Sequence, residues 1–318
     1  MDPLSHLLDG PRARGAFALK VLMAPGWAIQ VQDQAPLTIM VMLAPRAWIA
    51  ADGERHELAA GDVALVRGPA PYRVADDPAR EADVVILPHQ ECTTPSGAKV
   101  SLGMDRGVRT WGGGSAGDPV LLVGTYATDA QVTAAVASTL PRVAVLPAGS
   151  IDPALLAVLE REITTSAPGQ GGIIDRLLDV VLVHAVRTWA LRHPAATTGW
   201  LAGTTDPLVA AALRLFHDEP AEPWTLPRAA ARLHVSRATL ATRFRTHVGE
   251  PPMTYLSNWR LLLASELLAD RGLTTASIAA RVGYGSPFAL SAAFKRRYGI
   301  SPTAYRSREG AAPATTTD

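Results

Sequence analysis

Cations suited to binding phosphate are grouped at two places near the carboxyl end of this chain. The first group is Arg237, Arg243 and Arg245, and the second is Lys295 and Arg296. Such side chains neutralise the backbone phosphates of a nucleic acid. From residue 207 onward the chain holds 14 Lys and Arg against 8 Asp and Glu, whereas residues 1–206 hold 16 against 21. The basic excess therefore lies with these groups, although the solvated face of an ordinary helical bundle would also be basic.

The only cysteine is a second candidate for chemistry. Cys92 lies three residues after His89 in the segment LPHQECTTPSG, so the two form a candidate sensor site. An imidazole beside a thiol lowers the pKa of the thiol and raises its reactivity towards oxidants or metals. Without a second cysteine, oxidation would give a sulfenic acid, a mixed disulfide or a bridge between subunits. The alternative is a buried cysteine that packs as a small hydrophobic side chain.

Ligands for a metal are sparse in the first half of the chain. His56 with Glu54 or Glu57 could contribute some of them. An enzyme-type metal centre needs three or four ligands that converge, and these cannot be assembled here. We therefore expect no catalytic residue, no metal and no cofactor, with a metal enzyme that carries an accessory DNA-binding domain as the alternative.

Four aromatic residues of the same half are candidates for an effector pocket. They are Trp27, Trp48, Tyr72 and Trp111. Pockets for small ligands are mostly apolar with a few polar groups, which indole and phenol rings supply. The alternative is that these rings fill a hydrophobic core.

The elements that position the first cations read as two short helices joined by a turn. In WTLPRAAARLHVSRATLATRFRTHVG, Thr225 and Ser236 can each cap a helix. His234 lies at the turn, where a left-handed residue is expected and His is among the few non-glycine residues that accept it. Leu240 and Phe244, four residues apart, predict the buried face of the second helix. The outward face is then Arg237, Ala238, Ala241, Thr242 and Arg245.

The same pattern recurs around the second group of cations, in LTTASIAARVGYGSPFALSAAFKRRYG. Its caps, turn and buried pair are Thr274 or Thr275, Gly283, Ser286, and Leu290 with Phe294. Between the two patterns, PPMTYLSNWRLLLASELLAD predicts a helix with the apolar face Tyr255, Leu256, Trp259, Leu263 and Leu267. A rigid connector of this kind would let both second helices enter successive major-groove segments roughly 34 Å apart. The sequence therefore predicts a DNA reader.

This stretch resembles the AraC/XylS family of transcription regulators. The matching residues are Trp224, Thr225, Ser236, Arg237, Phe244, Gly249, Pro252, Tyr255, Leu256, Arg260, Leu261, Ile278, Ala279, Val282, Gly283, Tyr284, Ser286, Ala293, Phe294, Lys295, Arg296, Gly299, Pro302, Tyr305 and Arg306. The resemblance implies binding to promoter DNA, usually as an activator that contacts RNA polymerase. The implied DNA-binding residues are Arg237, Ala238, Thr239, Ala241, Thr242, Arg243, Arg245, Ser286, Pro287, Phe288, Ser291, Ala292, Lys295 and Arg296.

Two positions depart from the family pattern. The family often has Arg where this chain has Thr242 and Ala292. Bidentate contacts to guanine are therefore not available from these positions, and specificity must rest on Arg237, Thr239, Ser291 or DNA shape.

Residues 16–147 read as β structure. Short apolar runs such as LTIMVML and DVALVRG alternate with Gly, Pro and Asp turn signals, which is typical of a sandwich or small barrel. Residues 53–74 resemble the core hairpin of the cupin fold, in which a turn such as Gly61-Asp62 leads into a strand. We therefore expect an α+β chain with a cupin-like β-barrel, controlled by an effector or redox signal, before an all-α double helix-turn-helix.

After Asp152 the apolar period changes from two to 3.6. The stretch IIDRLLDVVLVHAVRTWALR predicts a long helix that is apolar on nearly every side, and such a helix needs partners on two faces. We assign one face to the barrel and the other to a second subunit of a homodimer, through Leu178, Leu182, Val183 and Val186. The alternative is that PALLAVLEREI covers this helix within one chain.

The expected domain boundaries follow these changes of pattern. They are a sensing domain over 1–150, a helical dimerisation hairpin and linker over 151–206, a DNA-binding domain over 207–310 and a disordered tail over 311–318. MDPLSHLLDG lacks the features of a signal peptide and no apolar run reaches the ~18 residues that span a bilayer, so we expect a cytoplasmic protein. A repair regulator that accepts alkyl groups would need several zinc-binding cysteines, whereas this chain has 1.

Overall fold

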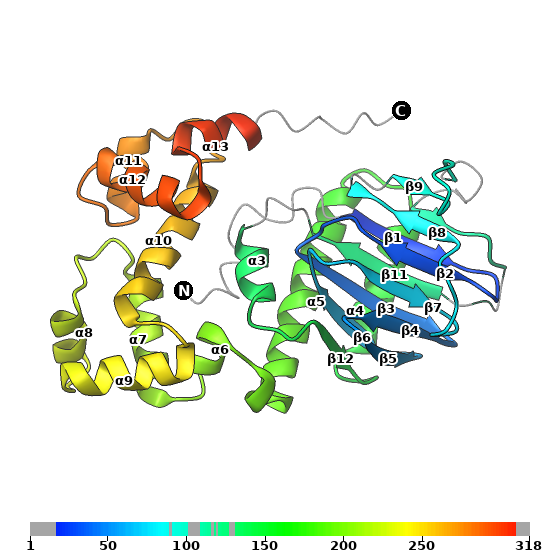
Figure 1. Ribbon diagram of the computed structural model, residues 1–318, viewed down its shortest axis with the longest axis horizontal. Helices are drawn as coiled ribbons and strands as arrows, with labels where there is room; N and C mark the ends of the chain where they lie inside the picture. The colour runs from blue at the N-terminus through cyan, green and yellow to red at the C-terminus, as the bar shows by residue number, and fades with distance from the viewer. Residues whose placement is uncertain are drawn as a thin grey trace. The chain divides into compact units, whose positions relative to one another are not determined.

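The computed structural model describes residues 17–88, 91–100, 109–115, 118, 120–126 and 131–309 (Figure 1). It divides into two compact units, of which one ends at Ala196 and the other begins at Thr197. The first unit is called the sheet unit below and the second the helical unit. His89 and the tail expected over 311–318 lie outside the described residues.

The strands of the sheet unit form two six-stranded sheets. The first, in spatial order, is β10 (Thr110–Trp111), β1 (Phe17–Leu22), β11 (Val120–Thr125), β3 (Leu37–Ala44), β6 (Val63–Arg67) and β12 (Val143–Leu146). The second is β5 (Glu54–Ala59), β4 (Arg46–Ala51), β7 (Tyr72–Ala75), β2 (Ala28–Val31), β8 (Val84–Ile86) and β9 (Cys92–Thr93). The pairs β1 with β10 and β2 with β8 are parallel, and the others are antiparallel.

The two sheets differ in how their strands are buried. Every residue from Leu37 to Met42 of β3 is buried, as expected for a strand covered on both faces. In β4, by contrast, Ala47, Ile49 and Ala51 are buried while the residues between them are not, so the outer face meets solvent. We call the first the covered sheet and the second the open sheet.

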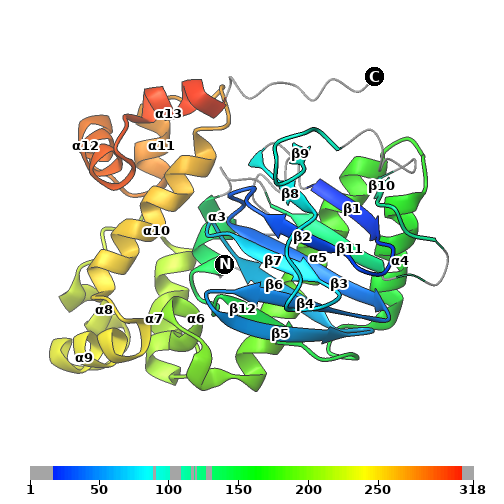
Figure 2. The same ribbon diagram turned by 45° about the vertical axis from the view of Figure 1, so that its right-hand side comes forward.

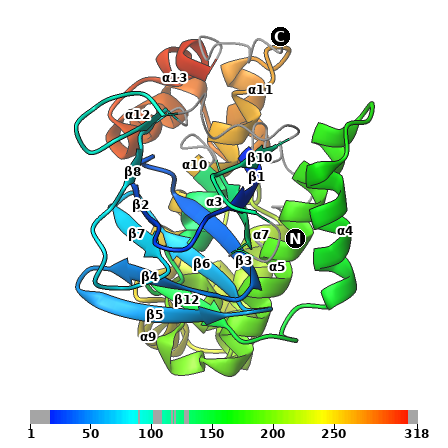
Figure 3. The same cartoon turned by 90° about the vertical axis from the view of Figure 1, so that its right-hand side faces the viewer.

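Helices account for the burial of the covered sheet. They are α3 (Gln131–Ala137), α4 (Pro153–Thr164) and α5 (Gln170–Arg192), and the short η2 (Pro194–Ala196) follows against α5. Figures 2 and 3 show α4 and α5 side by side against this sheet. A Cβ on Gly124 of β11 would lie 2.5 Å from Leu178 of α5, so glycine lets the helix approach closely. The Tyr126 hydroxyl then donates to the Leu178 carbonyl at 2.9 Å.

The β structure and the helical hairpin were therefore predicted correctly, but a closed barrel was not found. Among the described residues, no ladder of strand hydrogen bonds joins the two sheets, which face each other across a shared hydrophobic core. The Gly61-Asp62 turn has the expected form, with Gly61 at φ +87°. Its Asp62 carboxylate accepts from the amides of Ala59 at 2.8 Å and Ala148 at 2.9 Å, which fixes the start of β6.

The helical unit contains α6 (Gly199–Gly203), α7 (Pro207–Asp218), α8 (Leu226–Arg232), α9 (Arg237–Val248), α10 (Pro252–Leu267), α11 (Thr275–Arg281), α12 (Pro287–Tyr298) and α13 (Pro302–Glu309). Phe216, Phe244 and Tyr255 pack together around α9, with Phe244 and Tyr255 ring centroids 5.6 Å apart. Phe294 occupies the matching place in α12, 5.3 Å from the ring of Tyr305. Helix α6 lies in a stretch that the sequence analysis assigned to a linker, and its Trp200 and Leu201 are buried.

No helix in the described ranges is both long and apolar enough to cross a lipid bilayer.

Candidate nucleic-acid interface and interior cavity

Helices α8 and α9 form the first helix-turn-helix, with the capping that its sequence predicts. The Thr225 hydroxyl accepts from the Arg228 amide at 3.3 Å, and the Ser236 hydroxyl accepts from the Thr239 amide at 3.0 Å. Between them His234 adopts φ +56°, the left-handed turn that was expected. The turn and the caps fix the angle at which α9 leaves α8.

Helix α9 has one buried and one exposed face. Leu240 and Phe244 are fully buried, as predicted from their spacing. The side chains of Arg237, Ala238, Thr239, Thr242, Arg243 and Arg245 are exposed, and Ala241 is half-buried. Each predicted contact residue of α9 is therefore at least partly accessible.

Helices α11 and α12 repeat this arrangement. Thr274 and Ser286 cap them, accepting from the amides of Ser277 and Ala289 at 3.1 Å each, and Gly283 takes the left-handed turn at φ +78°. Of the predicted contact residues, Phe288, Ala292, Lys295 and Arg296 are exposed, and Ser286, Pro287 and Ser291 are half-buried. Phe288 is 85% exposed at the first turn of α12, which is unusual for so large an apolar side chain.

Helix α10 joins the two helix-turn-helix units by packing on both. Tyr255 in its first half contacts Phe244 of α9, while Leu261 and Ala264 in its second half belong to one cluster with residues of α11 and α12. Of the five apolar positions that the sequence predicted, Tyr255, Leu256 and Trp259 are buried, whereas Leu263 and Leu267 are only partly buried. Leu262 is buried as well. A connector packed at both ends holds α9 and α12 in a fixed relation.

Arg260 provides a second link between the two helix-turn-helix units. Its guanidinium donates to the carbonyls of Pro220 at 2.7 Å and Glu222 at 2.6 Å, in the segment before α8. The same segment contacts the turn of the second unit, because a Cβ on Gly283 would lie 2.7 Å from the Pro220 oxygen. Arg260 matches the family pattern, but this contact could not be predicted from the sequence because it joins residues far apart in the chain.

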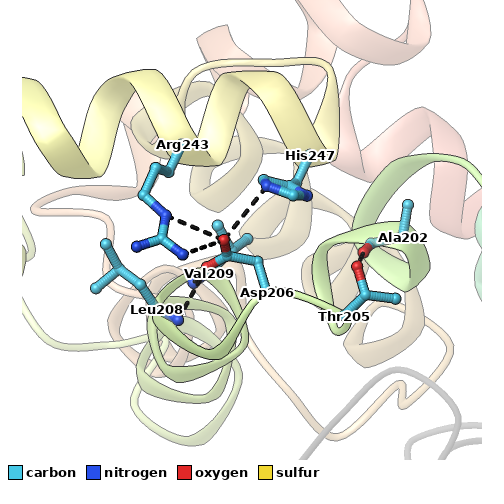
Figure 4. Close-up of polar contacts among 7 residues, drawn as sticks. All are labelled: Ala202, Thr205, Asp206, Leu208, Val209, Arg243 and His247. Carbon is cyan, nitrogen blue, oxygen red and sulfur yellow. Dashed lines mark hydrogen bonds and ion pairs between the residues drawn. The ribbon is translucent and has the colours of Figure 1, made fainter.

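Asp206 contacts the carboxyl-terminal half of α9 through Arg243 and His247 (Figure 4). Its carboxylate caps α7 by accepting from the amides of Leu208 at 2.9 Å and Val209 at 3.0 Å. It also pairs with Arg243 and lies 3.3 Å from Nε2 of His247. Burial alone would raise the pKa of this carboxyl, but the Val209 amide, Arg243 and His247 together lower it.

The Asp206 contact gives Arg243 a different partner from the one that was predicted. Arg243 was expected to face phosphate, yet the structure gives it an internal carboxylate partner. No ion pair is found within the described residues for Arg237, Arg245, Lys295 or Arg296. These four cations remain available to an anionic partner.

The sheet unit contains a cavity of about 370 Å³ between its two sheets, within the range of small-molecule sites. Of the four predicted pocket aromatics, Trp27, Tyr72 and Trp111 line it. Trp48 does not: it lies on the outer face of the open sheet, at a position that alternates with the buried residues of β4. The other lining residues are Leu19, Val21, Ile29, Val31, Asp33, Met40, Val74, Ile86, Cys92, Arg109, Thr110, Leu121, Val123 and Thr125.

Cys92 lies at this cavity rather than in an exposed loop. Its side chain is half-buried in β9, where Cys92 pairs with Ile86 of β8, and burial raises the pKa of the thiol. A raised pKa reduces the thiolate fraction on which reactivity depends. His89, the proposed partner, lies outside the described residues.

The candidate metal ligands do not gather in the structure. His56 lies 3.5 Å from a Glu54 carboxylate oxygen, and this oxygen is on a side chain that is 78% exposed. Within the described ranges, no group of three or more His, Cys, Asp or Glu side chains could hold a metal ion.

The four side chains predicted to mediate dimerisation are buried within the single chain. Leu178, Leu182, Val183 and Val186 are at most 7% exposed. The apolar residues that α5 does expose are Ile173 at 45% and Leu191 at 82%. A subunit contact on α5 would therefore use this other face.

Known protein families match both parts of the sequence. Residues 2–190 match a cupin family, and residues 229–308 match a helix-turn-helix domain. An AraC-like transcription regulator from Streptomyces antibioticus is 33% identical over 96% of this chain and 98% of its own length. A regulator of the same description from Streptomyces lividans is 34% identical over the same shares.

One solved structure is similar to the helical unit alone. It is the crystal structure of the DNA-binding domain of AdpA, a global transcriptional factor, in complex with a target DNA. The two sequences are 35% identical, and the match covers 32% of this chain and 92% of that chain, with a TM-score of 0.31.

Proposed function

The chain belongs to the AraC-like transcription regulators, which makes it a DNA-binding regulator with a cupin-like amino-terminal region, and from that premise we propose that it activates transcription in response to an effector held by the sheet unit. The observation that supports the DNA-binding part most directly is the pair of capped helices, α9 and α12, each with a buried Leu-Phe pair behind an exposed face.

The proposed docking places α9 and α12 in successive major-groove segments of one duplex. Both helices are held by α10, and two reading helices on one rigid support require binding sites that are one helical turn apart. Arg237, Arg245, Lys295 and Arg296 contact phosphate in this arrangement, because they are exposed and no carboxylate in the described chain neutralises them. Arg243 instead supports α9 through Asp206.

Base reading in this proposal falls to short and apolar side chains. Thr239 and Thr242 on α9 can hydrogen-bond to base edges, whereas Phe288 on α12 presents a ring suited to the methyl group of thymine. Because Thr242 and Ala292 stand where the family often has Arg, the preferred sites should depend less on guanine at those positions.

Control of this activity is assigned to the cavity of the sheet unit. It lies between two sheets, is lined mostly by apolar side chains, and is large enough for a small molecule. We assign a homodimer contact to the exposed face of α5, which carries Ile173 and Leu191. When bound to a promoter, the protein contacts RNA polymerase in this proposal.

Footprinting of the full chain on the promoters next to its own gene tests the function. The expected result is protection of two major-groove segments on one face of the duplex, about 10 base pairs apart. Protection at 50 mM salt that weakens steeply at 200 mM would support phosphate contacts. Absence of protection on any promoter fragment, at either salt concentration, would contradict the proposal.

The dimer contact needs its own test. Leu191→Glu places a charge on the exposed face of α5 without disturbing the buried core, and Ala157→Glu, at an exposed position of α4, is a matched control. Sedimentation should show a dimer for the wild type and the control, and a monomer for Leu191→Glu. A dimer that persists in Leu191→Glu would remove this face from the interface.

A further inference from the structure

Phe288 holds an apolar ring in solvent on α12. Its side chain is 85% exposed, whereas Phe216, Phe244 and Phe294 are fully buried. Phe294 lies on the same helix and belongs to its buried Leu-Phe pair, so the core behind α12 is complete without the ring of Phe288. The ring is therefore available to a partner outside the helical unit.

The position of Phe288 in its helix is the position of Ala238 in α9. Ser236 and Ser286 cap the two helices, each accepting from the amide three residues further on, and each helix begins at the residue after its cap. Phe288 and Ala238 are thus the second residues of helices whose amino-terminal ends meet base edges in the proposed docking. Single exposed apolar residues are common on protein surfaces, so the argument rests on this position and not on exposure alone.

The accessible part of α12 offers bases almost no hydrogen-bonding side chain. Within residues 287–293 the only polar side chain is that of Ser291, which is half-buried. The exposed residues of this stretch are Phe288, Ala289 and Ala292. The matching stretch of α9, residues 237–243, instead exposes two arginines and two threonines. The two helices are therefore suited to different features of a base pair.

The major groove presents one apolar group that such a surface can contact. Base edges there carry hydrogen-bond donors and acceptors, and thymine adds a methyl group on C5. Covering a donor or acceptor with an apolar ring costs free energy, because the group loses water without gaining a partner. Covering the methyl group is favourable. Cytosine and uracil lack this methyl group, whereas 5-methylcytosine carries it.

Cations on α12 accompany the ring. Residues four and seven apart lie on one side of a helix, so Phe288, Ala292 and Lys295 form a single stripe. Phe288 and Lys295 are separated by about 10 Å along the helix axis. Lys295 and the neighbouring Arg296 are exposed, so they can meet backbone phosphate while the ring lies against base edges.

We propose that Phe288 makes α12 a reader of the C5-methyl group of a pyrimidine, so that its half-site contains a thymine or a 5-methylcytosine that neither uracil nor cytosine replaces. This inference rests on the proposed function and goes beyond the role given to the ring there, because the methyl group itself, and not the base that carries it, is the feature recognised. Affinity then responds to methylation of a cytosine at that place in the site.

The test starts from a duplex that the full chain selects out of a pool of randomised sequences. Each thymine of this duplex is replaced in turn by deoxyuridine, which removes one methyl group and keeps the base pair. For the unaltered protein, at least one replacement should raise the Kd about fourfold, the factor expected for one methyl-sized apolar group. Fluorescence anisotropy measures the Kd. If every replacement leaves the Kd unchanged, the proposal is wrong.

Phe288→Ala shows whether the ring is responsible for this sensitivity. Because the ring is exposed, the variant should unfold at the same temperature as the unaltered protein. At one sensitive thymine it should bind the thymine and uracil duplexes with equal Kd. Thr246→Ala, at an exposed position of α9 outside the predicted contact residues, is the control and should keep the fourfold difference. A difference that persists in Phe288→Ala at every sensitive thymine would assign the methyl group to other residues and overturn the proposal.

A second pair of duplexes separates the methyl group from the rest of thymine. At the sensitive position the T·A pair is changed to C·G, with and without a methyl group on C5 of the cytosine. Methylation should lower the Kd about fourfold for the unaltered protein and leave it unchanged for Phe288→Ala. If methylation does not change the Kd of the unaltered protein, the base and not its methyl group is recognised, and the proposal is wrong.

The selection step separates this proposal from the proposed function. A chain that selects no duplex from the pool contradicts the proposed function, and the present inference fails with it. A chain that selects a duplex in which every thymine tolerates uracil leaves the proposed function intact, and only the methyl-reading role of Phe288 fails.

Discussion

The helical unit and the sheet unit present their candidate residues in opposite directions. In the helical unit the candidate residues point outwards from α9 and α12, and buried pairs such as Leu240 with Phe244 support them from behind. In the sheet unit the candidates Trp27, Tyr72, Trp111 and Cys92 line a cavity between two sheets. An outward site leaves a pattern in the sequence because core and contact residues differ in type. An inward site uses the same apolar residue types as a core, so it leaves almost no distinguishable pattern in the sequence.

Removing the exposed cations should have the largest effect on the outward site. Near 0.15 M salt each phosphate contact contributes about fivefold to affinity, so changing Arg237, Arg245, Lys295 and Arg296 together to Ala should weaken promoter binding several hundredfold. Each removed cation should also lower the slope of log affinity against log salt by about one unit. Fluorescence anisotropy with promoter DNA measures both quantities. If the slope of log affinity against log salt is unchanged, other residues of the helical unit make the phosphate contacts.

Gly283→Ala should have the next largest effect, through stability. The residue has φ +78°, and the added Cβ would lie 2.7 Å from the Pro220 oxygen, so strain and a steric clash combine. We expect the free energy of unfolding of the helical unit to fall by about 2–3 kcal/mol. Gly299→Ala is the control, since Gly299 has φ +77° but no atom within 4 Å, and it should lose only about 1 kcal/mol. Equal losses in a denaturant titration would show that the Pro220 contact is unimportant.

Thr242→Arg tests whether the outward face reads bases. An Arg at this exposed position on α9 can make a bidentate contact to guanine, which is worth about 1–3 kcal/mol of discrimination. Selection from a pool of randomised sites should then show a new preference for guanine at one position. If the substitution strengthens binding to all sites equally, Thr242 faces the phosphate backbone instead.

Asp206→Asn should have a smaller effect, and one that depends on pH. The pKa of Asp206 is lowered in the folded state relative to about 3.9 in an unfolded chain. A lowered pKa stabilises the fold above the unfolded value, and this contribution disappears as the pH falls through the folded value. The variant, which keeps a helix cap, should therefore be about 1 kcal/mol less stable than the wild type at pH 7. The difference should shrink below about pH 4, and a constant difference in urea unfolding would contradict this origin.

Cys92→Ser should have the smallest effect on promoter binding. Cys92 lies at the cavity of the sheet unit and not on the DNA-binding surface. Because burial raises the pKa of the thiol, alkylation of the native protein by iodoacetamide should be slower than that of a small reference thiol at the same pH. Promoter affinity should stay within about twofold of the wild type. Fast labelling of the native thiol would instead support the sensor role expected from its neighbour His89.

The parts that could be predicted from the sequence are those set by neighbours in the chain. The caps at Thr225 and Ser236 and the left-handed turn at His234 depend on residues three or four positions apart, and all three are confirmed. Leu290 and Phe294 are buried for the same reason, because their spacing follows the helix period.

The parts that could not be predicted depend on contacts between distant segments. Asp206 was assigned to a linker because nothing near it in the sequence shows that Arg243 and His247 will meet it. Trp48 was placed in the pocket because the sequence does not show which face of β4 meets the open side of its sheet. The prediction of a closed barrel was wrong for a similar reason, since strand patterns indicate the strands but not their pairing at the edges of a sheet.

Helix α6 and Asp206 also determine where this protein can be recombined with others. Both precede the expected domain boundary at residue 207, yet α6 packs against α9 and Asp206 caps α7. A chimaera that grafts a foreign sensor at residue 207 would leave Val209 and α9 without these partners. Grafts made between Ala196 and Thr197 retain them, so this junction is the one at which sensors can be exchanged.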